Sequence, residues 1–223
     1  MAHSYEGCDE DFGLSGLTQK VRYPTLFPDE TEALRLVERM AGYFDGANAG
    51  RLLEDVQLLL ASSLPDEVIV TLWLAATRRY FDPVAHGLDG RAWLNRIADV
   101  CVARIRLDDP SFVLPAAPEP VGDQGVRAAV LEEIRGVSPA LTKAAVTSLY
   151  APALPDVVPA LERAVAEVGA DLAFRLFLRA MKAYFVPISE ARHSRFLLLG
   201  EMLGYHEFVV DDGCLNVWDD LVD

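Results

Sequence analysis

Two pairs of histidine and carboxylate side chains are the residues of this sequence best suited to chemistry. His86 and Asp89 stand three positions apart, and Glu190 and His193 repeat that spacing. On a helix this spacing puts both groups on one face, and two such pairs brought together would offer two imidazoles and two carboxylates. Iron, manganese and zinc all accept such a ligand set. The pattern predicts a metal site, and the enzyme class that we would expect there is a non-haem iron oxygenase.

The same four residues also have a simpler interpretation, which we favour. His86 stands in a glycine-containing segment that predicts a loop, and Asp89 precedes a stretch of helical periodicity that it is suited to cap. Glu190 follows the capping residue Ser189, in a first turn where the helix dipole favours an acid. A di-iron bundle uses two Glu-x-x-His motifs, whereas this sequence contains one. Capping or surface roles are therefore the main expectation, with the metal site as the alternative.

Helical periodicity, capping residues and proline start signals cover most of the chain. No segment shows the strict alternation, bounded by hairpin turns, that predicts a β-strand. The sequence therefore predicts an all-α fold of about nine helices in two packed halves. Their expected ranges are about 28–45, 48–61, 65–81, 91–106, 123–135, from 138 onward, 156–168, 170–185 and 189–205.

Composition divides the chain into five segments. Scattered glycine, serine and acids without periodicity predict a flexible arm at the N-terminal end, and four prolines between 107 and 122 predict a linker. The predicted segments are the acidic arm 1–27, helical half one 28–106, the linker 107–122, helical half two 123–205 and the acidic-hydrophobic C-terminal tail 206–223.

The two predicted halves resemble each other at an offset of 104 residues. When Val70–Ala98 is aligned on Phe174–Met202, eight of 29 positions are identical, including a Tyr-Phe-x-Pro stop signal at Tyr80 and Tyr184. An internal duplication would let equivalent helices pack about a pseudo-twofold axis. Chance similarity between amphipathic helices is the other interpretation.

Aromatic and arginine side chains at matching positions of the two halves predict a ligand pocket. For the aromatic residues, which lie at helical spacing, we favour the simpler interpretation that they form the core. An apolar content of 52% and a mean hydropathy of +0.18 exceed what a small monomer needs, so a homodimer interface or a small apolar ligand would use the surplus. The residues predicted to line the pocket are Trp73, Tyr80, Arg91, Phe177, Tyr184 and Arg195.

Acidic residues are concentrated at the two ends of the chain. The 34 acids and 20 bases give a net charge of −14, and residues 201–223 hold seven acids and no base. This charge disfavours binding to nucleic acid or to an anionic membrane. The three cysteines match neither a zinc motif nor a disulfide framework. With no long apolar run and no secretory signal, the sequence predicts a soluble, cytoplasmic protein.

The C-terminal tail interleaves its acids with Phe208, Trp218 and Leu221. Apolar anchors among acids are typical of a peptide that docks in a basic groove. The alternative, which we favour, is a latch in which Trp218 and Leu221 fold back onto the protein's own helices. His206 and Glu201 lie near the end of the last predicted helix and could form a general base in a cleft, although the helix dipole explains a histidine there more simply.

These patterns rank three functions. The first is a soluble helical binding or accessory protein that engages a protein partner or a small apolar ligand between its halves. The second is the metal-dependent oxygenase, with iron, manganese or zinc as its cofactor. The third is an acidic inhibitor or immunity-type partner of a basic protein.

Overall fold

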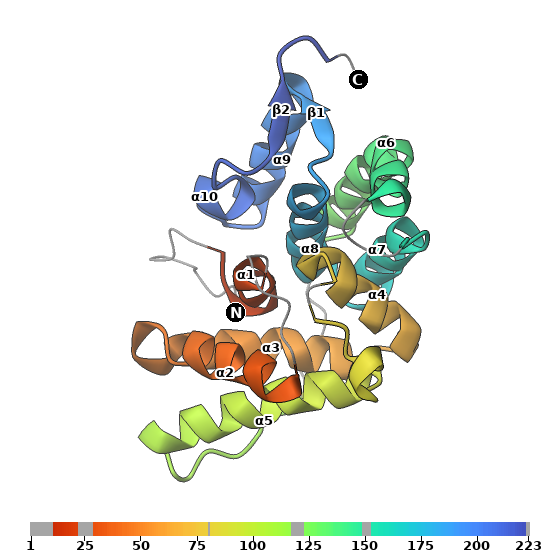
Figure 1. Ribbon diagram of the computed structural model, residues 1–223. Coiled ribbons are helices and arrows are strands. Elements are labelled where there is room, and N and C mark those ends of the chain that lie inside the picture. The colour runs from red at the N-terminus through yellow and green to blue at the C-terminus, as the bar shows by residue number, and fades with distance from the viewer. Residues whose placement is uncertain (1–10, 22–28, 80, 117–122, 149–152, 222–223) are drawn as a thin grey trace.

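The computed structural model describes residues 11–21, 29–79, 81–116, 123–148 and 153–221. This part of the chain is mainly helical, as the sequence predicts, with ten α-helices, two short 3-10 helices and two three-residue strands (Figure 1). Tyr80, predicted to line a pocket, and most of the predicted acidic arm lie outside the described residues. No helix in the described ranges is both long and apolar enough to cross a membrane.

Local start signals place most helices where the sequence predicts them. Asp29, Asp89, Asp123 and Ser189 each accept a backbone N–H two or three residues further along the chain, as N-cap residues do. The helices are α1 (Gly13–Lys20), α2 (Glu30–Ala41), α3 (Ala47–Ala61), α4 (Asp66–Thr77), α5 (Gly90–Asp108), α6 (Gln124–Thr147), α7 (Val157–Glu167), α8 (Ala170–Ala183), α9 (Glu190–Met202) and α10 (Glu207–Val210). The 3-10 helices are η1 (Phe44–Gly46) and η2 (Val84–His86), and the strands are β1 (Pro187–Ser189) and β2 (Asn216–Trp218).

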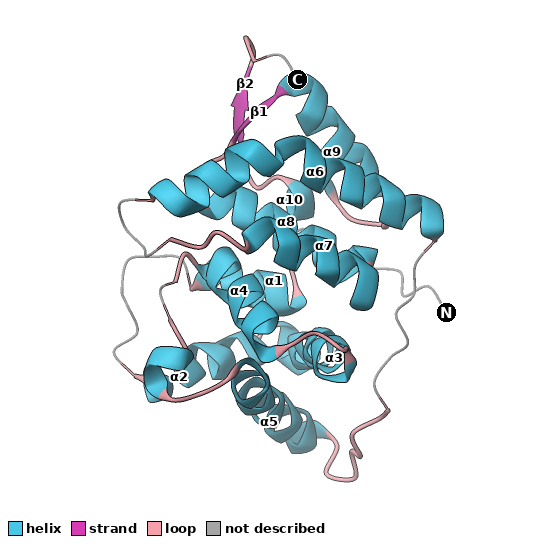
Figure 2. Cartoon of the chain, turned by 90° about the vertical axis from the view of Figure 1, so that its right-hand side faces the viewer, coloured by secondary structure: helices cyan, strands magenta, loops and turns pink. Residues whose placement is uncertain are grey.

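The helices stack in tiers around one core. α2, α3 and α5 pack together at one end, and α9, α10 and the two strands form the other end (Figures 1 and 2). α1, α4, α7 and α8 lie between these ends, while α6 packs on α7, α8 and α9. The sequence assigns α4 to half one, yet α4 packs against α7 and α8 as well as α5. The two predicted halves therefore share a single hydrophobic core.

Residues 11–21 do not form the predicted flexible arm. They carry helix α1, whose Leu14 and Leu17 are buried and which packs against α3, α4 and α8. The sequence conceals this helix because it is only eight residues long and contains Gly13 and Gly16, which have poor helix propensity. A helix this short has little stability alone, so burial against its neighbours must hold it.

Several helix boundaries differ from the prediction, including the ends of α2 and α9, which come at Ala41 and Met202. The helices expected at 123–135 and from 138 are one helix, α6, which continues through Pro139. A proline that starts a new helix and a proline inside a long helix have the same local sequence pattern. In α6, however, buried residues on either side of Pro139 form one continuous apolar stripe, which favours a single helix. α4 ends at Thr77, earlier than predicted, because Arg78 and Arg79 adopt positive φ angles of 51° and 60°.

β1 and β2 form a parallel pair that the sequence does not predict. Pro187, Ile188 and Ser189 pair with Asn216, Val217 and Trp218. Strands of three residues are too short to show an alternating pattern, and their pairing depends on a chain reversal through α9 and α10.

The internal duplication stays a prediction. α4 and α8 occupy corresponding places at the 104-residue offset and pack against each other. Their surroundings differ, however, because Phe81 is 1% exposed whereas its counterpart Phe185 is 58% exposed.

Candidate functional site

The first predicted metal-binding pair serves local structure. His86 ends η2, and its ring stacks on Phe81 with 5.0 Å between the ring centroids. Asp89 is the N-cap of α5, and its carboxylate accepts the backbone N–H of Ala92 at 2.7 Å. The favoured interpretation of Asp89 as a capping residue is therefore confirmed.

The second pair lies at the other end of the molecule. Glu190 is exposed in the first turn of α9, and His193 Nε2 lies 2.9 Å from Asp211 Oδ2. α5 and α9 belong to opposite ends of the stack, so the two pairs do not meet (Figure 1). Among the residues that the structure describes, no group of three or more histidine, cysteine or acidic side chains is placed to hold a metal. The structure therefore does not bring together the four residues predicted to bind iron, manganese or zinc.

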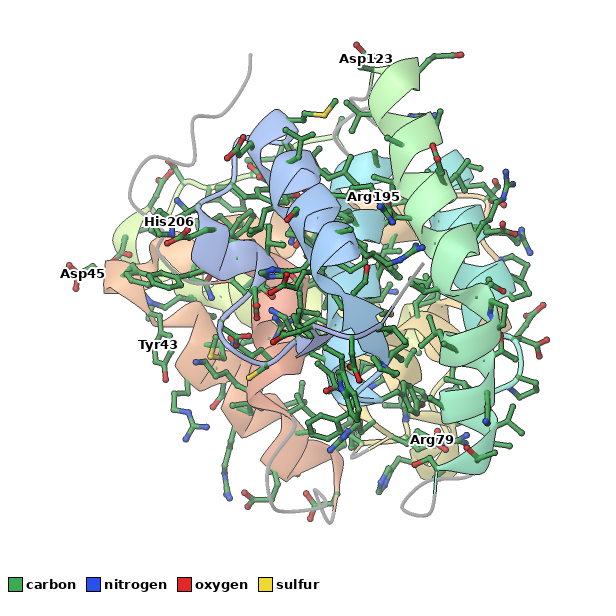
Figure 3. The ribbon with its side chains drawn as sticks, turned by 90° about the horizontal axis from the view of Figure 1, so that it is seen from above. Tyr43, Asp45, Arg79, Asp123, Arg195 and His206 are labelled. Atoms are coloured by element: carbon green, nitrogen blue, oxygen red, sulfur yellow. The ribbon has the colours of Figure 1, made fainter. Side chains whose placement is uncertain are left out.

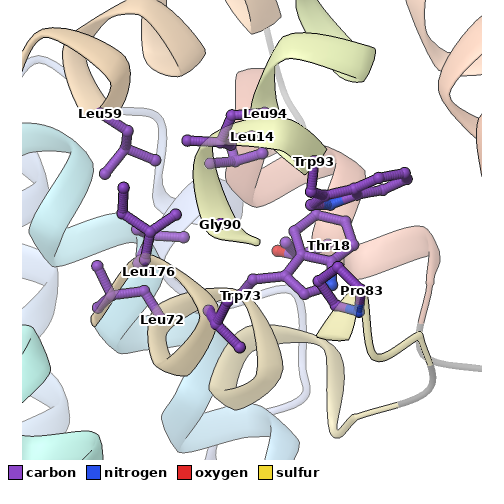
Figure 4. Close-up of a pocket in the computed structure, with 12 residues that line it drawn as sticks. Leu14, Thr18, Leu59, Leu72, Trp73, Pro83, Gly90, Trp93, Leu94 and Leu176 are labelled. Atoms are coloured by element: carbon purple, nitrogen blue, oxygen red, sulfur yellow. The ribbon is translucent and has the colours of Figure 1, made fainter. Parts of the chain in front are cut away.

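The predicted pocket aromatics belong to the core. Trp73 and Trp93 meet edge to face, with ring centroids 5.3 Å apart, beside a cavity of about 10 Å³ (Figure 4). Such a cavity has room for a single water, far below the roughly 300 Å³ of a typical small-molecule pocket. Phe177 is fully buried and packs edge to face on Phe196 at 5.4 Å. Tyr184 is half-buried, and burial raises the pKa of its hydroxyl.

The two predicted pocket arginines have separate structural partners. Arg91 donates to the main-chain carbonyls of Leu60, Ser62 and Leu64 at 2.5–2.9 Å, which satisfies the C-terminal end of α3. Arg195 Nε donates to Glu133 Oε1 on α6 at 2.6 Å. Among the described members of the predicted pocket, the two arginines are therefore held apart by separate partners.

A buried row of bases on α8 is the feature that the sequence analysis missed. Arg175, Arg179 and Lys182 are 1%, 2% and 4% exposed and follow one another at helical spacing. Both terminal nitrogens of Arg175 donate to Asp55 of α3, at 2.7 and 2.8 Å. Asp55 also accepts the backbone N–H of Leu14 at 2.8 Å, so this pair ties α1 to α3 and α8.

The acids at the two ends of the chain neutralise this row. Arg179 Nε lies 3.0 Å from Asp11 Oδ2, next to α1, and Lys182 Nζ lies 2.9 Å from Asp212 Oδ1, after α10. Asp212 also lies 4.0 Å from Arg179, so the two ends converge on one helix. Part of the terminal acidity is therefore structural. Three bases at i, i+4 and i+7 on a helix whose other residues, apart from Asp171, are apolar are the signal that could have revealed it.

Burial shapes the pKa values of this network. Desolvation raises the pKa of the Asp55 carboxyl, and the adjacent Arg175 guanidinium opposes that shift. Desolvation lowers the pKa of the Arg175 guanidinium, but the neighbouring Asp55 and Asp171 carboxylates outweigh that effect and keep its pKa well above the ordinary value. Burial and the neighbouring Arg179 lower the pKa of Lys182, whereas Asp212 opposes this change. These groups act as a buried structural unit.

The C-terminal layer, defined as residues 185–221, presents apolar side chains to solvent. Leu215 and Val210 are buried and β2 pairs with β1, so the predicted tail is folded onto the protein. Its three predicted docking residues nevertheless remain outside, at 40–52% exposure. The exposed large apolar residues of the layer are Phe185, Leu198, Met202, Phe208, Trp218 and Leu221.

The charged side chains of the C-terminal layer fall into those that pair within the protein and those that face solvent. Its two bases, Arg192 and Arg195, both pair with Glu133 of α6, at 3.0 and 2.6 Å, and of the two only Arg195 stays substantially exposed, at 43%. Asp211 and Asp212 face inward, to His193 and Lys182. Five further acids of the layer are exposed, namely Glu190, Glu201, Glu207, Asp219 and Asp220. Among its described residues, the solvent-facing side of the layer therefore carries five acids whose charges no base of the layer offsets except the exposed Arg195, together with the apolar residues.

A cleft of about 280 Å³ opens in this layer between α9 and α10. His206, at the start of α10, lies at the edge of the molecule seen from above (Figure 3). Its Nδ1 accepts the backbone N–H of Phe208 at 3.3 Å, so this histidine caps α10. The cleft is lined by Leu197, Glu201, Tyr205, His206, Glu207 and Val210.

Comparison of the chain with protein families, curated proteins and solved structures gave no match. The function must therefore be argued from the geometry of the chain itself.

Proposed function

We propose that this protein is a binding protein whose C-terminal layer docks a basic protein partner. The observation that carries the proposal is the excess of exposed acid in that layer, where both arginines pair with the buried Glu133 while five acids and six large apolar side chains are exposed. An acidic surface steers a basic partner toward it, and aromatic and methionine side chains are enriched at protein interfaces.

The same charges argue against a second copy of this chain as the occupant. In a symmetric dimer through the layer, each exposed acid would approach the acids of the other copy, and like charges across an interface are costly. A small apolar ligand between the two predicted halves finds no comparable support, because the interior cavity beside Trp73 measures only about 10 Å³.

A set of 15-residue synthetic peptides tests the proposal. Basic content (Lys, Arg) and apolar content (Leu, Phe) would be varied independently, and binding to the full chain measured by fluorescence anisotropy at 150 mM salt. We expect the basic, apolar peptides to bind, the basic peptides without apolar residues to bind more weakly, and acidic peptides to show no binding. Affinity should fall as salt rises to 500 mM, because the attraction is partly between exposed charges.

Matched charge reversals locate the surface. We expect Asp219→Lys with Asp220→Lys to weaken peptide binding by about tenfold. Glu38→Lys with Glu132→Lys makes the same change in net charge on α2 and α6, outside the layer, and should change affinity by less than about twofold. Equal losses in the two double variants, or no binding by any basic peptide, would overturn the proposal.

A further inference from the structure

The cleft between α9 and α10 combines an apolar floor with acidic walls. Leu197 is half-buried and Val210 is 1% exposed, while Glu201 and Glu207 are exposed and come from different helices. Its volume of about 280 Å³ lies just below the range of roughly 300–1,000 Å³ typical of small-molecule pockets. The cleft therefore suits one side chain or a ligand of similar size.

The backbone around the cleft is fixed by close packing. A Cβ atom at Gly200 would collide with the side chain of Val210, so α10 packs directly on the backbone of α9. Gly204 has a φ angle of +78°, which turns the chain between the two helices. Tyr205 then donates its backbone N–H to Gly200 O at 2.8 Å. A cleft built in this way exists before its ligand arrives, which lowers the entropic cost of binding.

The lining selects the chemistry of the occupant. Two carboxylates disfavour an anion such as a phosphate or carboxylate. Among the described residues, the two carboxylates and His206 are not positioned to bind a metal ion together. Carboxylates above an apolar floor match a ligand with an apolar stem and a cationic end, and lysine and arginine side chains have this form.

We propose that this cleft binds one lysine or arginine side chain of the partner protein. The inference rests on the proposed function, because the basic partner supplies the side chain. The alkyl stem packs on Leu197 and Val210, and the cation lies between Glu201 and Glu207. The other exposed apolar residues of the C-terminal layer then contact the surface around this anchor, as apolar contacts surround a buried hot spot at many interfaces.

Small cations test the cleft without any peptide. Isotope-labelled full chain would be titrated with n-butylammonium and n-butylguanidinium ions and followed by amide NMR. We expect saturable shifts confined to residues near 197–210, with dissociation constants of about 1–10 mM, and no such shifts with butyrate. Glu201→Gln with Glu207→Gln should weaken cation binding at least about fivefold, whereas the matched pair Glu38→Gln with Glu132→Gln, outside the layer, should not.

The outcomes separate this inference from the proposed function. Shifts outside the cleft, shifts unchanged by Glu201→Gln with Glu207→Gln, or stoichiometric Zn²⁺ binding that this variant abolishes would overturn the inference. If basic peptides nevertheless bind the layer, the proposed function stands alone. If the inference and the proposed function are both correct, replacing one basic residue of the peptide by norleucine should lower its affinity for the wild-type protein about tenfold. The same replacement should lower its affinity for the double variant much less, as a double-mutant cycle requires.

Discussion

The buried pair of Asp55 and Arg175 gives the sharpest test of the fold. Asp55 is 5% exposed and Arg175 is 1% exposed, and two hydrogen bonds of 2.7 and 2.8 Å join them. Asp55→Ala removes both bonds and the bond from Leu14 N to the same carboxylate. It leaves a buried guanidinium whose other carboxylate, Asp171, lies 3.2 Å from Nε.

The expected loss follows from burial. Removing one partner of a buried ion pair typically costs 3–5 kcal/mol, because the remaining charge stays desolvated. We therefore expect Asp55→Ala to lower the free energy of unfolding by about 4 kcal/mol. The combination Asp55→Leu with Arg175→Met should be less destabilised than Asp55→Leu alone, because it removes the unpaired charge and fills the space with apolar atoms.

Urea unfolding followed by far-ultraviolet circular dichroism at pH 7 measures these losses. The matched control is Asp108→Ala, which breaks a 2.6 Å ion pair with Arg104 on α5 whose acid is 66% exposed. An exposed pair of this kind contributes about 0–1 kcal/mol, so the control should barely change the midpoint. If Asp55→Ala costs no more than Asp108→Ala, the row of bases on α8 is not buried and the argument for the network fails.

Three further changes test other parts of the structure. Leu17→Ala, at a fully buried position of α1, should cost about 2–5 kcal/mol in urea unfolding, and a negligible loss would restore the flexible arm. Burial raises the pKa of the Cys101 thiol from 9.0 to about 12, so the unfolded chain loses this proton first as pH rises and stability falls above pH 9. At pH 10.5, the free energy of unfolding should have fallen by about 2 kcal/mol because of Cys101. The Cys101→Val variant should lack this loss between pH 8 and 10.5, and an equal loss in variant and wild type would contradict the raised pKa of Cys101. Glu133→Ala should cost about 2–3 kcal/mol in the same urea assay, less than Asp55→Ala, because its partner Arg195 is 43% exposed and keeps contact with water. A larger loss than that of Asp55→Ala would show that water does not screen this pair.

Local signals in the sequence predicted most of the helices. Asp29, Asp89, Asp123 and Ser189 cap helices because a side-chain oxygen needs only the next two or three backbone N–H groups, all within one turn. The same locality limits the prediction. Pro139 carries a helix start signal inside α6, and nothing within one turn shows that the apolar stripe continues beyond it.

The sequence predicts individual residues of the candidate site but not the fold that brings them together. The favoured interpretation, a latch in which Trp218 and Leu221 fold back onto the helices, is wrong for these two side chains, because both are exposed, as is Phe208. His206 and Glu201 were placed near a cleft, and both line one. The sequence could not show that β2 folds back on β1 while leaving its anchors outside, because that outcome depends on pairing between residues about 30 positions apart.

The helical class, most helix starts and the concentration of acids at the two ends of the chain follow from the order of the amino acids. These properties depend on neighbours in the chain or on simple counts. Which charges are buried and which face solvent depends instead on how the helices pack. No local sequence pattern distinguishes the buried partners of α8 from exposed acids such as Asp219 and Glu207. Folding brings distant segments of the chain to α8, so that its three bases are neutralised by Asp11, Asp55 and Asp212. Desolvation makes those contacts obligatory, since a buried base without a counter-charge would destabilise the fold.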